Sequence, residues 1–295
     1  MKIDDVFILE ERGILYISGD DTDTFLQNLI SNDIKKVNDS NSCFASLLTP
    51  QGKYLFEFII TKHKKGYFLE CEKKIIDALF LKLNSYKFRS KIELLNLSNE
   101  FVVAVLSREK FLTLDKSRDI AGYTTKFRED PIYLDPRHKD LGARLITNLE
   151  KLHLSLKLLK LKSTNIDQYY SISSEIGIPQ INTDKLQNNL FGIECNLNEL
   201  NGIDFKKGCY VGQENTARIK LKDKLSKRLF PVEVIDGDLN KEKIINCDKS
   251  ELGKVLINNK YPFAVIKFKD KKFKFDKIYK CGDASIKIKK PSWFK

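Results

Sequence analysis

The chain has 295 residues, of which 42% are hydrophobic and 31% charged, and it carries a formal net charge of +12 at pH 7. This composition is that of an ordinary globular protein, and the length allows two modest domains or a compact assembly of about two or three modules. No stretch approaches the roughly 18 unbroken apolar residues that a membrane-spanning helix needs, so the sequence predicts no membrane contact.

The first half of the chain alternates apolar runs typical of strands with amphipathic stretches typical of helices. Strands are predicted over residues 13–19, 43–49, 54–61, 67–71, 91–97 and 101–107. Helices are predicted over residues 20–31 and 72–86, where apolar side chains recur at helical spacing. Strands that alternate with helices in this way predict a mixed α+β body built from split βαβ-like units.

The second half is less regular until its last 70 or so residues. Residues 130–147 indicate strand, turn and strand, and residues 167–177 a helix that Gly177 ends. Residues 152–158 alternate apolar and polar side chains like a strand, although a helix also fits. Short β runs at regular spacing then predict a small barrel or sandwich from about residue 227 to 290.

The six cysteines are scattered, and no two of them are closer than 14 residues. This spacing excludes the paired cysteines of zinc, thioredoxin-like and ferredoxin-like motifs, so we expect no metal site built on such pairs. The first residues, "MKIDDVFILEERG", lack the apolar segment of a secretory signal and are too acidic for a typical mitochondrial presequence. We therefore expect a cytoplasmic monomer whose thiols are reduced and mostly buried.

The positive charge is concentrated in the C-terminal part. Residues 1–205 hold 28 Lys and Arg against 29 Asp and Glu, whereas residues 206–295 hold 24 against 11. A basic module of this kind could make a weak contact with RNA. Its lysines are dispersed among strand-like residues without an RNA-binding motif, so a solvated basic face explains the charge equally well.

The stretch "KGCYVGQE" contains the most informative cysteine. Gly208 and Gly212 permit a positive φ or a close backbone approach on either side of Cys209. The neighbouring cations Lys207 and Arg218 could lower the pKa of its thiol. From spacing alone, Cys209 is either a working thiol or a small residue in a tight turn.

The same stretch, followed by Ala217 and Arg218, resembles the signature of the YgfZ family of folate-binding proteins, and in particular its branch of iron–sulfur assembly factors. The segments "GDDTDTFLQNLISND", "LLTPQGKYLFEF", "DPRHKDLGAR" and "GIPQI" are similar to further family blocks and follow in family order. The resemblance therefore covers nearly the whole chain. It implies the fold of the glycine-cleavage aminomethyltransferase, or T-protein.

That fold implies an α+β body over residues 1–225, made of two intertwined modules of which one is ferredoxin-like, and a small β-barrel over residues 226–295. The resemblance also implies tetrahydrofolate, or a one-carbon derivative, as the ligand. Its function would be the assembly or repair of [4Fe–4S] clusters together with iron–sulfur assembly proteins or client enzymes, with an effect on tRNA modification. The alternative is a folate-dependent aminomethyl or one-carbon transferase; a non-enzymatic factor is favoured, and turnover is left open.

The T-proteins carry two adjacent acids where this chain has Phe56 and Glu57, so the resemblance implies loss of the first acid. Phenylalanine cannot relay a proton, which favours a folate binder over a transferase. Glu175 matches the glutamate that grips the pterin ring, and Glu57 is either a pocket residue or a structural acid. Asn32 and Asp33 could line the pocket entrance, although turn chemistry explains both.

The remaining candidates support the motif, with Cys209 as the catalytic thiol. Bidentate pairing within "DPRHKDLGAR" could fix the middle of the chain to the cysteine loop, through Asp135, Arg137 and Arg144. The expected loop supports are Lys207, Gly208, Tyr210, Gly212, Gln213, Glu214 and Arg218. We expect Tyr210 to pack, Gln213 and Glu214 to anchor the loop, and Trp293 to clasp two domains together.

Overall fold

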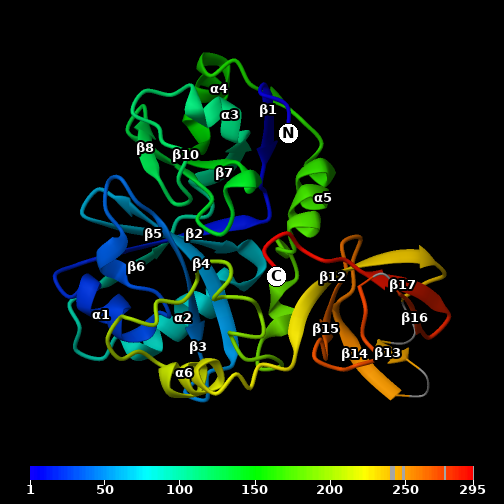
Figure 1. The fold of residues 1–295 in the computed structure, drawn as a ribbon. Coiled ribbons are helices and arrows are strands. Elements are labelled where there is room, and N and C mark those ends of the chain that lie inside the picture. Colours follow the sequence, from blue (N-terminus) through cyan, green and yellow to red (C-terminus); the bar gives the residue numbers. More distant parts are fainter. Residues whose placement is uncertain (240–242, 248–249, 276, 295) are drawn as a thin grey trace.

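The computed structural model describes residues 1–239, 243–247, 250–275 and 277–294, and these form two open sheets and a closed barrel (Figure 1). The first sheet has the strand order β3-β4-β5-β2-β6. Its strands are β2 (Arg12–Ser18), β3 (Cys43–Leu48), β4 (Tyr54–His63), β5 (Gly66–Glu72) and β6 (Glu93–Asn96). Helices α1 (Thr22–Leu29) and α2 (Ile76–Tyr86), with the short 3-10 helices η1 (Ile34–Lys36) and η2 (Lys73–Ile75), cover one of its faces.

The second sheet has the order β11-β1-β7-β10-β9-β8 and lies above the first in Figure 1. Its strands are β1 (Asp5–Ile8), β7 (Phe101–Leu106), β8 (Thr124–Phe127), β9 (Asp130–Leu134), β10 (Ala143–Asn148) and β11 (Lys162–Ser163). The helices that accompany it are α3 (Arg108–Leu112), the 3-10 helix η3 (Lys139–Leu141) and α4 (Leu149–Leu158). Phe7, Ile59 and Tyr133 belong to one buried cluster, so the two sheets pack face to face through their apolar sides.

The strand interpretation of residues 152–158 is wrong, because these residues lie in α4. Asn148 caps this helix, its side chain accepting a hydrogen bond from the backbone N–H of Glu150 at 2.9 Å. Leu152, Leu156 and Leu159, at positions i, i+4 and i+7, pack against the second sheet. The alternation of apolar and polar residues therefore concealed a helical stripe.

The C-terminal prediction is confirmed in its barrel form. Strands pair in the closed order β12-β15-β14-β13-β16-β17. They are β12 (Arg228–Asp236), β13 (Ile244–Cys247), β14 (Ser250–Ile257), β15 (Phe263–Ile266), β16 (Ile278–Cys281) and β17 (Ala284–Ile288). The α+β class of the body is confirmed as well. No helix among the described residues is long and apolar enough to cross a membrane.

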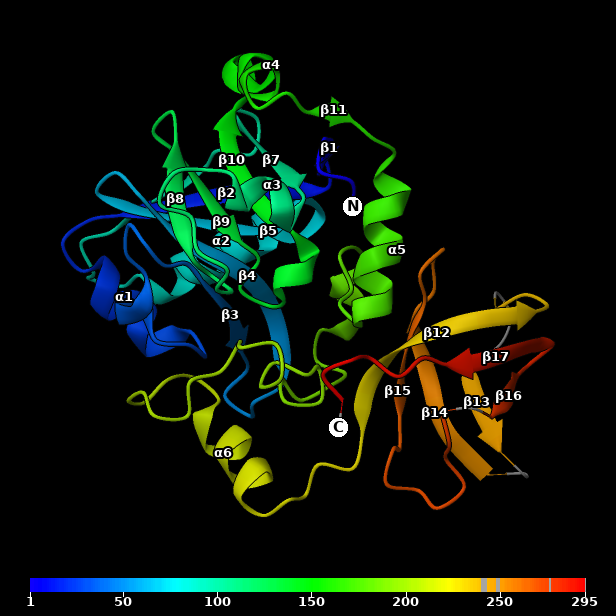
Figure 2. The same ribbon diagram turned by 45° about the horizontal axis from the view of Figure 1, so that its top comes forward.

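Two connections place the barrel beside the body. Helix α5 (Ile166–Ile176) lies between the second sheet and the barrel, and the chain after the last strand returns to its lower end (Figure 2). Trp293 donates a hydrogen bond from its indole Nε1 to the carbonyl oxygen of Ile176 at 2.7 Å. The other connection runs through the 3-10 helix η4 (Thr183–Leu186), a long loop and α6 (Gln213–Leu221) to β12. Trp293 thus clasps the barrel side to the body, as expected.

Candidate functional site

Cys209 is the exposed cysteine of the chain, and the other five are buried. It lies in the loop just before α6, which runs along the outer edge of the molecule in both ribbon views (Figures 1 and 2). A methyl group built at the preceding Gly208 would meet no described atom within 4 Å apart from its chain neighbours. The thiol therefore stands on a solvent-facing stretch of backbone.

The other side of the loop is held tightly. Gly212 has a φ of +84°, and a Cβ built there would lie 2.5 Å from the carbonyl oxygen of Thr49 in the β3–β4 turn. Gly52 of that turn has a φ of +80°, and its Cβ would lie 3.1 Å from the carbonyl oxygen of Gly212. The two backbones approach as only glycines allow. A requirement for glycine thus holds at 212 and not at 208.

Lys207 fixes the start of the loop. Its ammonium donates hydrogen bonds to the carbonyl oxygens of Gln27, Ile30 and Asn32, at 2.8, 2.7 and 2.9 Å. These carbonyls lie at and just beyond the C-terminal end of α1, where the helix dipole favours a cation. Removal from water lowers the pKa of Lys207 to about 8. All three protons of the ammonium are directed at the backbone, which makes Lys207 a clamp on the loop rather than a partner of the thiol.

The other motif residues divide between the interior and the surface. Tyr210 is buried, and its ring centroid lies 5.0 Å from Nζ of Lys207, so it packs as expected. Gln213 begins α6 half-buried, whereas Glu214 and Arg218 are exposed. Two other residues make side-chain hydrogen bonds at the start of α6. Asn215 donates to the carbonyl oxygen of Gln51 at 2.9 Å, and Thr216 to that of Gly212 at 2.9 Å.

Asn32 and Asp33 are held by turn and loop contacts. The Asn32 amide donates to the carbonyl oxygens of Phe44 and Asn201, both at 2.8 Å, and its oxygen accepts from the N–H of Asp33 at 2.9 Å. Asp33 caps η1 by accepting from the backbone N–H of Lys35 at 3.0 Å. These bonds favour turn chemistry for both residues.

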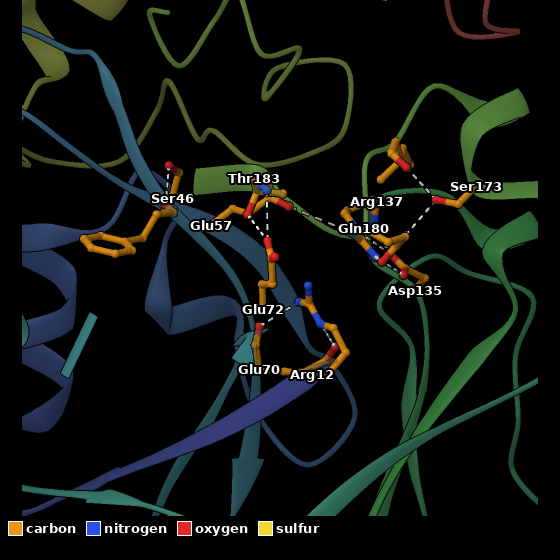
Figure 3. Close-up of polar contacts among 12 residues, drawn as sticks. Arg12, Ser46, Glu57, Glu70, Glu72, Asp135, Arg137, Ser173, Gln180 and Thr183 are labelled. Carbon is orange, nitrogen blue, oxygen red and sulfur yellow. Dashed lines mark hydrogen bonds and ion pairs between the residues drawn. The ribbon is translucent and has the colours of Figure 1, made fainter. Parts of the chain in front are cut away.

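Asp135, Arg137 and Arg144 meet in a buried charge cluster, of which Figure 3 shows Asp135 and Arg137. Arg137 grips Asp135 with two parallel hydrogen bonds, from Nε to Oδ1 at 3.0 Å and from Nη2 to Oδ2 at 2.7 Å. Arg144 adds a bond from Nε to the same Oδ2 at 2.8 Å and forms an ion pair with Glu70 of β5. The bidentate pairing is present within the segment after β9, and the Arg144–Glu70 pair joins the second sheet to the first rather than to the cysteine loop.

Three acidic or basic residues of the cluster were not anticipated from the sequence. Arg12 donates from Nε to Glu70 at 2.8 Å, and both side chains are buried. Glu72 accepts from the backbone N–H and the hydroxyl of Thr183, at 2.9 and 2.7 Å, and so holds η4. The available signal was an acid inside an apolar strand run, as in "YFLEC". Such an acid requires a buried partner.

Glu57 is the fourth carboxylate of this cluster. Burial raises its pKa above the ordinary value, against the opposing pull of Arg137 and Arg12. Its Oε1 lies 3.9 Å from Nη1 of Arg137, which is too far for a hydrogen bond. That Nη1 and the hydroxyl of Tyr54 are buried without a hydrogen-bond partner among the described residues. Phe56, by contrast, packs on the other face of β4 beneath α1 and α2.

These polar groups match a folate only in part. Unpaired donors beside a carboxyl suit a polar heterocycle, because such a ligand could bond to each of them. The pocket that reaches this cluster at Gln180 has a volume of about 10 Å³, room for about one water molecule. Glu175 is exposed at the end of α5. The donor set therefore suits a folate head, but this pocket does not have the space for one.

A larger groove of about 820 Å³ opens beside the β4–β5 turn at Lys62 and His63. That is the end of β4 opposite to the cysteine loop, about 30 Å away at 3.3 Å per residue. Its lining mixes acids and bases, and none of the expected site residues belongs to it. Among the residues with described coordinates, no group of three or more His, Cys, Asp or Glu side chains is arranged to hold a metal ion.

Sequence comparison finds curated relatives that are named as iron–sulfur cluster assembly factors. The chain is 27% identical over 266 residues to "Iron-sulfur cluster assembly factor IBA57 homolog, mitochondrial" of Dictyostelium discoideum, with 81% of this chain and 64% of that protein covered. It is 29% identical to the homologue of Neurospora crassa and 28% identical to IBA57 of Mus musculus, over 76% and 79% of this chain and 52% and 67% of those proteins. No family model matches the chain.

The fold comparison agrees with the architecture. The crystal structure of glycine cleavage system aminomethyltransferase T from Bartonella henselae superimposes with a TM-score of 0.75, over 98% of this chain and 86% of that one, at 11% identity. The expected aminomethyltransferase-like fold is therefore confirmed. At this identity the likeness establishes the fold alone.

The relatives differ from this chain in length, and their names bear on its location. The chain spans between about half and two thirds of their length. The expectation of a cytoplasmic protein is wrong, because these relatives are named mitochondrial.

Proposed function

We propose that this protein is an assembly factor for iron–sulfur clusters that acts in mitochondria, with Cys209 as its working thiol. The observation that carries the proposal is the single exposed cysteine, on a loop fixed from behind by Lys207 and Gly212. Similarity to the IBA57 assembly factors over about four fifths of the chain supports it. The proposal includes [4Fe–4S] clusters as the product and membership of the YgfZ-like branch. An effect on tRNA thiolation would follow, because that modification depends on iron–sulfur enzymes.

The thiol can contribute in one of two ways that this position allows. A thiolate is the form of cysteine that binds iron and that acts as a nucleophile, and an exposed loop gives a partner access to it. A single thiolate provides one of the four ligands that a cluster usually takes, so other ligands must come from a partner. The proposed partners are accordingly iron–sulfur assembly proteins or their client enzymes.

The test is aconitase activity in cells whose own copy is deleted and replaced by the wild type, Cys209→Ala or Cys247→Ala. Cys247 is buried in the barrel, so its variant removes a thiol without touching the loop. We expect the wild type and Cys247→Ala to restore activity and Cys209→Ala to fail, at equal protein levels. Rescue by all three proteins would remove the thiol from the function.

We further propose tetrahydrofolate as a ligand near Glu57. The shared aminomethyltransferase fold supports this site, as do the hydroxyl of Tyr54 and Nη1 of Arg137, which have no hydrogen-bond partner among the residues that the structure describes. Because the adjoining pocket holds about one water, binding requires this region to widen. Calorimetric titration should detect tetrahydrofolate binding to the wild type and weaker binding to Glu57→Gln. Equal affinities would place the ligand elsewhere, and no binding would reject it.

The second candidate is a folate-dependent aminomethyl or one-carbon transferase. One observation favours it: Glu57 is a buried carboxyl of raised pKa, a property that suits a proton donor. The discriminating assay is formation of methylenetetrahydrofolate from aminomethyl donors, with Glu57→Gln as the comparison. Turnover that Glu57→Gln abolishes would establish the transferase, and absence of turnover with the wild type would reject it.

A further inference from the structure

Several residues of the cysteine motif face solvent instead of supporting the loop. Glu214, Arg218 and Leu221 occupy positions i, i+4 and i+7 of α6 and form one exposed stripe, in which Leu221 is 85% exposed. Arg218 bonds only within its own helix in the described contacts, to Oδ1 of Asn215 at 2.5 Å. Cys209 precedes this stripe on the exposed loop. A thiol, an arginine and a leucine are thus exposed within one segment of the chain, residues 209–221.

Side chains in and just after the same segment also bond to the body and to the barrel. Lys220 donates to Oδ1 of Asn198 at 3.0 Å and lies 3.6 Å from the ring centroid of Phe205. Asp223 accepts twice from Lys269 of the barrel, both at 3.0 Å. Together with the clamp at Lys207, these bonds hold the surface in one conformation. A surface ordered in advance loses less entropy when it binds a partner.

The charge of this surface is strongly positive. Residues 206–227 contain seven Lys and Arg against two acids. Lys207 is committed to three carbonyls and Asp223 to Lys269, so these two take no part in the outer charge. The exposed cations are Lys206, Arg218, Lys220, Lys222, Lys224 and Lys227. Glu214 is the exposed acid that remains among them.

We propose that residues 206–224, the thiol-bearing surface, dock a protein that presents an acidic face to the cations and a small apolar site to Leu221. This inference rests on the proposed function, and it names the kind of partner that approaches Cys209. A second copy of the chain would bring like charges together. RNA would leave Leu221 without an apolar contact, and the aromatic rings at hand are not free to stack on bases, because Tyr210 is buried and Lys220 covers the ring of the neighbouring Phe205.

The functional test uses a variant, called the stripe variant, that reverses the charge of Arg218 in the stripe and of Lys222, four residues later. The double variant Arg218→Glu and Lys222→Glu removes four units of positive charge, and a matched control, Lys157→Glu and Lys254→Glu, makes the same change on exposed residues of α4 and β14. We expect the stripe variant to reduce rescued aconitase activity by roughly tenfold. Its new glutamates would face the acidic partner, and loss of electrostatic steering slows association by about 10-fold or more. Leu221→Ser should give a smaller loss. The control should match the wild type, and all variants should melt within a few degrees of it.

The partner is identified with a photo-crosslinking amino acid at position 224. The inference predicts a crosslinked product that protease removes, that ribonuclease leaves intact and that the stripe variant does not form. A product that ribonuclease removes would overturn it in favour of RNA. Full rescue by the stripe variant would also overturn it. If Cys209→Ala fails while the stripe variant rescues, the proposed function stands without this surface; if both rescue, the proposed function fails as well.

Discussion

The two glycines that flank Cys209 provide a sharp test, because the structure gives them opposite roles. Gly212→Ala places a methyl group 2.5 Å from the carbonyl oxygen of Thr49 and 3.0 Å from Cα of Gly52, at a φ of +84°. Gly208→Ala places the same methyl group in open space, without a positive φ. The first substitution should therefore destabilise the protein, and the second should not.

The magnitude follows from two contributions. An alanine in the left-handed region costs about 1–2 kcal/mol relative to glycine. Relief of the backbone clash must separate α6 from the β3–β4 turn, and forced packing of this kind costs about 1–3 kcal/mol. Together they predict a loss of about 2–5 kcal/mol for Gly212→Ala. Gly208→Ala should stay within about 0.5 kcal/mol of the wild type, as most surface changes do.

Urea denaturation followed by circular dichroism measures the stability of both variants. The rate at which Cys209 reacts with a neutral disulfide reports a change in the conformation of the loop. We expect Gly212→Ala to lower the denaturation midpoint and to change the thiol rate, because the anchor behind the thiol is displaced. Gly208→Ala should leave the midpoint unchanged. Equal midpoints for the two variants would refute the view that the loop is locked at Gly212.

Three further predictions concern the interior. Burial raises the pKa of Glu57, so the folded state keeps a proton that the unfolded chain releases above pH 4.5. The free energy of unfolding therefore falls as pH rises. Glu57→Gln should have a higher melting temperature than the wild type at pH 7, and the difference should shrink towards pH 4. Arg144→Met removes one of the two arginines that pair with buried Glu70 and one of the two that pair with buried Asp135, and urea denaturation should record a loss of about 3–5 kcal/mol. Trp293→Phe removes the bond to Ile176 and should cost about 1 kcal/mol, seen as a lower thermal midpoint by circular dichroism.

The sequence predicted the elements with strong periodicity and the chemistry of short turns. The barrel followed from regularly spaced β runs, and the α5 boundary from Gly177, whose φ of +85° ends the helix. Residues 152–158 misled because leucine at every second position also occupies every fourth, so the strand and helix periods coincide over one turn. The environment, not the pattern, decided between them.

The cysteine loop was predictable in outline but not in its supports. Sequence spacing put Lys207 beside the thiol, whereas the fold turns its side chain towards α1, some 180 residues earlier in the chain. Contacts across such separations depend on tertiary packing, which no local pattern encodes. The same holds for Arg12 and Glu70, which are paired across 58 residues.

Phe56 and Glu57 lie on opposite faces of β4, and this decides which role the acid can have. Neighbouring side chains on a strand point to opposite faces, so Phe56 under the helices and Glu57 in the charge cluster cannot exchange roles without a shift of register. Phe56 therefore removes an acid only from the face of the sheet that the helices cover. The opposite face, which lies in the charge cluster, keeps the carboxyl of Glu57. Loss of transferase chemistry cannot be argued from Phe56 alone. What separates a binding protein from a transferase is whether Glu57 gives up its proton to a ligand, and the comparison of wild type with Glu57→Gln measures that.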